Sequence, residues 1–193
     1  MATTLLLICI AATASSREGR FPDPAEPLDA AGARAAAQAV LSDRFRTSAY
    51  RSPSRAAAET ASAMALSASE EALLSDLSYG DWTGRSFAEI AGAQPGALDL
   101  WLSDPTQGTP GGESMDQALK RIGAWMDRIA ALDAPVCAIT HPMIVRAALA
   151  HALDLPLRST LAIDVAPLSH TVLSFNRSWR LQSLGLASGH APG

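Results

Sequence analysis

Near its start the chain reads Thr4-Leu5-Leu6-Leu7-Ile8-Cys9-Ile10-Ala11-Ala12-Thr13. A short apolar run rich in leucine and β-branched residues, followed by small residues, is typical of a buried strand that opens into a loop. In open α/β sheets, ligands bind at the carboxyl ends of such strands. We therefore expect a ligand to bind near the carboxyl end of this strand.

Strand-like and helix-like segments alternate along the rest of the chain. The predicted helices cover 30–41, with Asp29 as N-cap, 55–66, 113–132 and 142–153, with shorter ones near 87–90 and 95–102. The predicted strands cover 47–50 and 135–140, and a hairpin covers 170–175 and 179–184. The polar segment 14–24 is expected to be a loop. This alternation predicts an α/β layered fold with a mostly parallel sheet.

The length and composition limit the classes of protein to which the chain can belong. A chain of 193 residues fits one domain, predicted as 1–186 with an inserted cap region at about 76–112 and a disordered tail at 187–193. The net charge of −4 and the scattered arginines exclude the basic patch of a nucleic-acid binder. Cys9 and Cys137 lie in apolar strand-like runs, so both are expected to be buried thiols.

No apolar run reaches the length of a membrane span, so no membrane partner is expected. The first sixteen residues resemble a secretory signal, but they lack a positively charged start. Cleavage there would also remove the first strand. We therefore expect a cytoplasmic protein, and a homodimer stays open.

Three polar residues stand at the ends of predicted strands or the starts of helices. His141 lies between a buried strand and a helix start, where free N–H groups favour anions, although a core or capping role is the simpler interpretation. Arg55 in the first turn of a helix needs either solvent or an anionic partner. Asp76 is either an acid or a turn residue.

Five separated segments together resemble the histidine phosphatase superfamily, which has the phosphoglycerate-mutase-like fold. The family's Arg-His-Gly signature, followed by one residue and Thr, falls on Cys9-Ile10-Ala11-Ala12-Thr13, and Arg20 resembles the downstream arginine of that loop. Its Ser-Pro-x-x-Arg-Ala element, in its common variants, resembles Ser52-Pro53-Ser54-Arg55-Ala56. The other elements fall on Tyr79 to Gly84, on Gly111-Gly112-Glu113-Ser114, and on Thr140-His141 with Arg146-Ala147. Each motif alone is weak, whereas their order and spacing are specific.

The resemblance implies a three-layer α/β/α sandwich and a site that needs no metal or cofactor. In the family, an imidazole attacks phosphorus, arginines and a second histidine hold the phosphoryl oxygens, and a carboxylic acid protonates the leaving oxygen. These roles assign Asp76 and His141 to catalysis at a site whose nucleophile position is Ile10. They assign substrate binding to a second set, Cys9, Thr13, Arg20, Arg55 and Glu113.

Two substitutions in the first signature remove groups that this chemistry requires. Ile10 has no lone pair to attack phosphorus, and Cys9 replaces a permanent positive charge. Loss of a nucleophile costs on the order of a million-fold in another hydrolase, so we expect impaired catalysis. The remaining residues predict a site for a small anionic, phosphorylated metabolite, with Arg55 and His141 as its main contacts.

Three classes of function stay open on the sequence. The first is a phosphatase fold that has lost hydrolysis and binds an anionic ligand. The second is an active phosphatase whose sequence carries a substitution at position 10. The third is a repurposed pocket in which His141 and Asp76 perform acid/base chemistry on a substrate without phosphorus.

Overall fold

The computed structural model describes residues 2–104 and 106–186, and its centre is a six-stranded sheet in the order β3-β2-β4-β1-β5-β6. β1 pairs in parallel with β4 and antiparallel with β5, and the β5–β6 hairpin forms one edge. Because β4, β2 and β3 also pair in parallel, the predicted α/β fold with a mostly parallel sheet is confirmed. The strands are β1 Thr3–Cys9, β2 Ala49–Arg51, β3 Ser69–Glu70, β4 Pro135–Thr140, β5 Ser169–Asn176 and β6 Ser178–Leu186.

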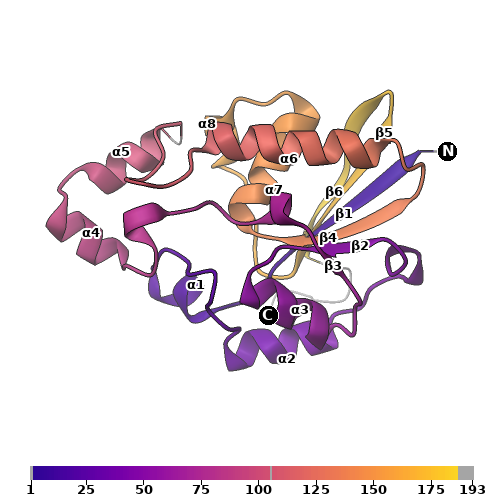
Figure 1. Cartoon of the computed structure of the whole chain (residues 1–193), viewed down its shortest axis with the longest axis horizontal. Helices are drawn as coiled ribbons and strands as arrows, with labels where there is room; N and C mark the ends of the chain where they lie inside the picture. Colours follow the sequence, from indigo (N-terminus) through magenta and orange to yellow (C-terminus); the bar gives the residue numbers. More distant parts are fainter. Residues whose placement is uncertain (1, 105, 187–193) are drawn as a thin grey trace.

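Helices cover both faces of the sheet, which gives the predicted three layers (Figure 1). One face is covered by α6 (Met115–Ala130), α7 (Pro142–Leu153) and α8 (Leu157–Thr160). The other face is covered by α2 (Ala30–Gln38) and α3 (Arg55–Ala63). Helices α4 (Phe87–Ala93) and α5 (Ala97–Ser103) project to the side of the sheet.

The side chains of β1 alternate between two hydrophobic cores. Leu5 and Leu7 pack in the core that includes α6 and α7, whereas Leu6 and Ile8 pack in the core that includes α2 and α3. Burial of each side chain stabilises the fold by about 1.5–3 kcal/mol. A shift of β1 by one residue would exchange the two sets, so its register and the position of its carboxyl end are fixed.

The segment after β1 differs from the loop that the sequence predicts. Residues Ala14–Glu18 form a short helix, α1, because Thr13 and Ser16 make a capping box. The Thr13 N–H donates to Ser16 Oγ at 3.2 Å, and Gly19 ends the helix in the left-handed conformation. The predicted loop is wrong because this local capping chemistry satisfies the free backbone groups.

Aromatic packing joins the segment 76–112 to the chain that follows α1. Phe21 lies at ring-centroid distances of 5.1 Å from Tyr79, 5.2 Å from Trp82 and 5.5 Å from Trp101. Such ring pairs stabilise a fold beyond the effect of burying their apolar area. This cluster fixes the chain just before Pro22, which lines a cavity at the end of β1. The predicted limits of the domain stay a prediction, and the tail at 187–193 lies outside the described residues.

Gly32 allows α2 to approach the loop that follows β1. A Cβ atom at position 32 would lie 2.2 Å from the backbone oxygen of Ala12, which also accepts the Asp29 N–H. We therefore expect Gly32→Ala to lower the free energy of unfolding by about 1–3 kcal/mol, as overpacked sites do. Thermal denaturation measures the change.

Gly92 in α4 is the matched control, because a Cβ atom there meets nothing within 4 Å. Gly92→Ala should leave stability unchanged or raise it by up to about 1 kcal/mol. Equal melting temperatures for Gly32→Ala and the parent would contradict the close approach.

Candidate active site

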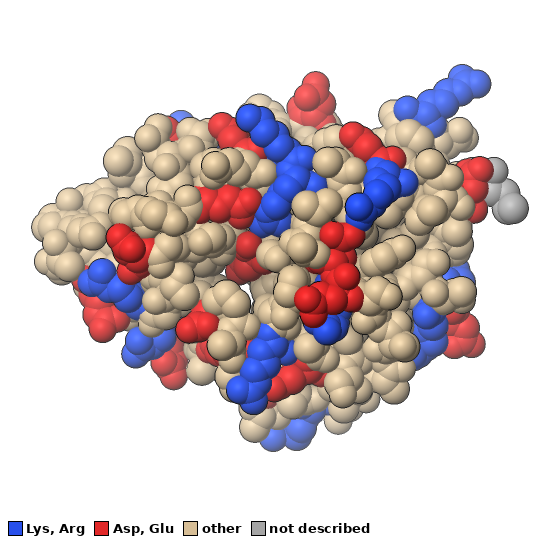
Figure 2. Space-filling view, viewed as in Figure 1, with Lys and Arg blue, Asp and Glu red and all other residues tan. Residues whose placement is uncertain are grey.

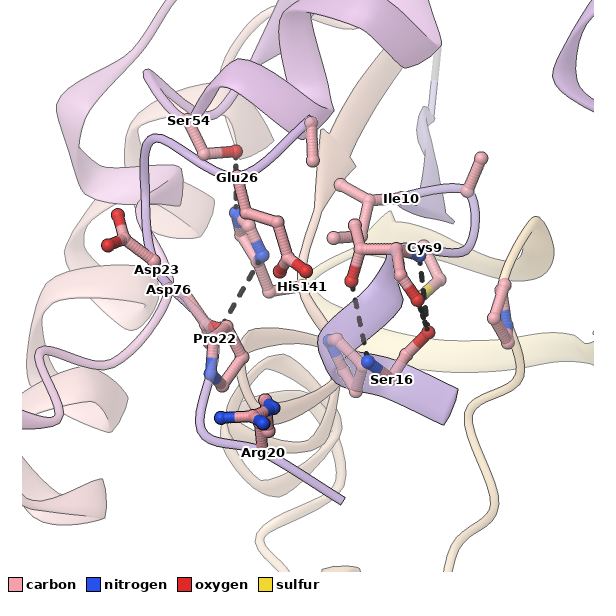
Figure 3. Close-up of a pocket in the computed structure, with 15 residues that line it drawn as sticks. Cys9, Ile10, Ser16, Arg20, Pro22, Asp23, Glu26, Ser54, Asp76 and His141 are labelled. Atoms are coloured by element: carbon pink, nitrogen blue, oxygen red, sulfur yellow. Dashed lines mark hydrogen bonds and ion pairs between the residues drawn. The ribbon is translucent and has the colours of Figure 1, made fainter. Parts of the chain in front are cut away.

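A cavity of about 170 Å³ lies at the carboxyl end of β1. The loop after β1, the start of α3 and the start of α7 contribute to its walls. Figure 3 shows several of its lining side chains. Six of the residues predicted from the sequence line it, namely Cys9, Ile10, Thr13, Arg20, Asp76 and His141. Arg55 and Glu113 are not among its lining residues.

His141 is the N-cap residue of α7, directly after β4, and its side chain is buried. Its Nε2 atom lies 2.9 Å from the Oγ of Ser52 and 3.2 Å from the Oγ of Ser54 (Figure 3 shows Ser54). Burial lowers the pKa of His141 from its usual range. The lowered pKa favours the neutral imidazole at pH 7, and a neutral imidazole can accept a proton.

Asp76 lies against the other side of the same imidazole. One of its oxygens accepts the Leu77 N–H at 2.9 Å, and the other lies 3.5 Å from His141 Nδ1. Burial raises the pKa of Asp76, while the adjacent His141 opposes that rise. Among the described residues, His141 Nδ1 has no hydrogen-bond partner.

Cys9 ends β1, Ile10 follows it, and both line the cavity without providing a usable nucleophile. The Ile10 N–H donates to the backbone oxygen of Thr140 at 2.8 Å, and the Ile10 side chain packs against both cores. Cys9 is only 1% exposed, and burial raises the pKa of its thiol far above neutrality. A thiolate nucleophile at Cys9 is thus disfavoured.

Arg55 points away from the cavity, which corrects the prediction that it contacts the ligand. Its Nε atom donates to Glu59 at 2.7 Å across one helical turn, and its side chain is 57% exposed. Counted from Ser52, the element Ser-Pro-x-x-Arg-Ala places its arginine at position 56, which is Ala56 in this chain. Ala56 lines the cavity. The helix turns position 56, not position 55, towards the site.

Glu113 does not line the cavity, whereas Arg20 does, and the substrate-binding role of Arg20 stays a prediction. Glu113 makes a two-point ion pair with Arg121, at 2.7 and 2.8 Å. Arg121 in turn donates to the backbone oxygen of Asp76 at 3.1 Å. Glu113 thus acts on the site through the backbone that carries Asp76 and through its charge, which contributes to the raised pKa of Asp76. The Arg20 side chain is 42% exposed, and its Nε atom donates to Glu18 at 3.0 Å.

The charged side chains around the cavity are mostly acidic. Asp23, Glu26 and Asp76 line it together with a single arginine, Arg20. Over the face in Figure 2, positive and negative side chains alternate without a continuous basic patch. Glu26, Ser52 and Ser54 are site residues that were not predicted from the sequence. The Ser-x-Ser spacing directly before the predicted helix was the signal for the two serines.

Within residues 2–104 and 106–186, no group of three or more His, Cys, Asp and Glu side chains could hold a metal ion. In the same residues, no helix is long and apolar enough to cross a membrane.

Comparison with known proteins agrees with this geometry. The sequence profile of the Histidine phosphatase superfamily (branch 1) matches residues 5–186. A bifunctional protein from Mycobacterium tuberculosis is 33% identical over 162 residues, which cover 79% of this chain and 44% of the relative. The chain thus spans less than half the length of that relative.

Solved structures resemble the chain over almost its full length. A mycobacterial glucosyl-3-phosphoglycerate phosphatase in complex with VO3 has a TM-score of 0.84 and 27% identity, covering 95% of this chain and 99% of the other. YhfR from Bacillus stearothermophilus has a TM-score of 0.85 at 23% identity, covering 96% and 98%, and shows the fold alone. The profile, the order of motifs and the fold lead to one conclusion: the chain belongs to the histidine phosphatase superfamily.

Proposed function

We propose that this chain binds a small molecule at the family's phosphate position without forming a phosphohistidine. The observation that carries the proposal is Ile10, whose side chain lines the cavity at the strand end where the family signature places the nucleophile. An alkyl side chain has no lone pair with which to form a bond to phosphorus.

The alternative of an active phosphatase with one altered residue has less support. Three positions that should carry an arginine, a histidine and an arginine are Cys9, Ile10 and Ala56. All three line the same cavity, although they come from two separate segments. A single substitution at position 10 would leave both arginines in place. The absence of both arginines, together with that of the histidine, supports a changed function of the pocket.

The charge of the lining bears on the choice of ligand. A small anionic, phosphorylated metabolite, as expected from the sequence, would find one arginine and three acidic side chains. Like charges around a cavity lower the local concentration of ligands with the same sign. We propose that the ligand is small and uncharged. The cytoplasmic location and the homodimer stay predictions.

Restoring the lost groups tests the proposal. The parent chain should not hydrolyse an aryl phosphate above the uncatalysed rate, and Ile10→His alone should hydrolyse it slowly. Ile10→His combined with Ala56→Arg should be about 10²–10³-fold faster than the single variant, because it regains a donor for the developing charge. Initial rates of aryl phosphate hydrolysis measure the series.

Ile10→Val combined with Arg55→Lys is the control, because it changes the same segments without adding a nucleophile or a cavity charge. Hydrolysis by the parent chain, with a phosphorylated side chain found by mass spectrometry, would contradict the proposal.

A second candidate function is acid/base chemistry on a substrate without phosphorus. The contact between Asp76 and His141 favours it, because burial raises the pKa of Asp76 and lowers that of His141, which shifts the two pKa values towards each other. Paired titratable groups with shifted pKa values are typical of acid/base sites. Such a pair is retained in this chain although the nucleophile position is aliphatic.

The same burial predicts a pH-dependent cost in stability. The pKa of Asp76 is raised in the folded chain. The contribution of the protonated carboxyl to the free energy of unfolding is therefore fully present below the pKa of the unfolded chain, and it is lost as pH rises through the pKa of the folded chain. Asp76→Asn should therefore raise the melting temperature at pH 8, by about 2–4 °C for each kcal/mol gained. The difference should vanish near pH 4.

Asp43→Asn is the control, because the Asp43 side chain is fully exposed and makes only a surface ion pair with Arg46. Surface ion pairs contribute little to the free energy of unfolding. The melting temperature of the Asp43→Asn variant should therefore equal that of the parent at both pH values. A lower melting temperature for Asp76→Asn at pH 8 would show that the charged carboxylate stabilises the site.

A further inference from the structure

We propose that Ser54, His141 and Asp76 form a nucleophile, base and orienting acid that hydrolyse small, uncharged carboxylic esters. The inference deepens the second candidate function, since it names a nucleophile and a substrate class for the acid/base pair. It starts from the two serine hydroxyls on His141 Nε2 and the carboxylate beside Nδ1.

The three side chains lie in the order that a serine nucleophile requires. Ser54 Oγ lies 3.2 Å from His141 Nε2, and Asp76 lies 3.5 Å from Nδ1 (Figure 3). Serine, imidazole and carboxylate in this order are recognised by geometry, because unrelated folds carry them in different chain orders. The contact to Asp76 is longer than a hydrogen bond, and such contacts often shorten when a substrate binds.

Ser54 is better placed than Ser52 to attack a substrate. Ser52 is fully buried, and its Oγ accepts the Ser54 N–H at 3.2 Å. Ser54 lines both the cavity of about 170 Å³ and a neighbouring cavity of about 260 Å³, as does Asp76. An ester whose carbonyl carbon lies beside Ser54 Oγ could thus place its acyl part in one cavity and its alcohol part in the other.

The backbone around Ser54 stabilises negative charge on its oxygen. Ser54 is the N-cap of α3, and its Oγ accepts the Ala57 N–H at 3.2 Å. Pro142, at the start of α7, lines the same cavity. The N-terminal ends of both helices carry partial positive charge, which favours the oxyanion of a tetrahedral intermediate.

The reaction balances without a metal or a second substrate. The Ser54 oxygen bonds to the ester carbonyl carbon as its proton moves to His141 Nε2, and the C–O bond to the alcohol breaks as that proton moves to the departing oxygen. Water, activated by the same nitrogen, then cleaves the acyl–serine bond. The products are a carboxylic acid and an alcohol.

The cavity lining supports an uncharged, compact substrate. Its apolar members are mostly small or cyclic, namely Ile10, Ala11, Pro22, Ala56, Pro142 and Pro167. Asp23 and Glu26 at the same cavity disfavour an anion, including a phosphate ester. A short-chain acyl ester of a neutral alcohol fits these features.

A fluorophosphonate reagent tests the nucleophile directly on the full chain. An activated serine displaces fluoride and forms a Ser–O–P bond, which intact-mass measurement and peptide mapping locate. We expect one adduct, on Ser54, and hydrolysis of a p-nitrophenyl acyl ester by the parent. His141→Ala and Ser54→Asn should each lower the ester rate by about 10³-fold or more.

Ser54→Asn keeps an N-cap side chain, and Ser114→Asn makes the same change at the N-cap of α6, away from the cavity. The Ser114→Asn variant should react with the fluorophosphonate and hydrolyse the acyl ester as the parent does. No adduct, an adduct on Ser52 or elsewhere, or full ester activity in Ser54→Asn would overturn the inference. An aryl phosphate assay on the same samples reports separately on the phosphohistidine proposal.

Discussion

The position of every site residue depends on the burial of β1 on both faces. Alternate side chains of this strand fill two separate cores, so the strand cannot slide or turn without exposing one set. β4 lies beside it in fixed parallel register, with Cys9 opposite Thr140. The ends of both strands therefore meet at one place, and His141 follows directly on the second. The family fold is retained because this constraint does not involve the chemistry of position 10.

Much of the architecture follows from local sequence signals. The apolar runs at β1 and β4 and the cap at Asp29 are short-range patterns, and the structure contains each of these elements. The helix α1 was not predicted, because its capping box lies in a polar segment without apolar periodicity. The antiparallel hairpin was predicted from alternation, and its place beside β1 is a long-range pairing that local patterns do not specify.

The candidate site was predictable only in part. The order of motifs placed Asp76 and His141 at one cavity, and the structure brings them to 3.5 Å. Arg55 was misplaced because it is merely the arginine nearest to the motif position. One position along a helix turns a side chain by about 100°, so Ala56 faces the cavity and Arg55 faces solvent. The acidic lining was missed because Asp23 and Glu26 lie in a segment without regular structure.

The state of His141 decides between the two ways in which the pocket could work. A phosphate site would use a positively charged imidazole, whereas a serine nucleophile requires a neutral ring with its lone pair on Nε2, facing the serine hydroxyls. Nitrogen-15 NMR of the histidine side chains at pH 7 measures this directly. We predict a neutral His141 with the proton on Nδ1, beside Asp76. A protonated imidazolium, or a neutral ring with the proton on Nε2, would contradict the proposed role of His141 as the base.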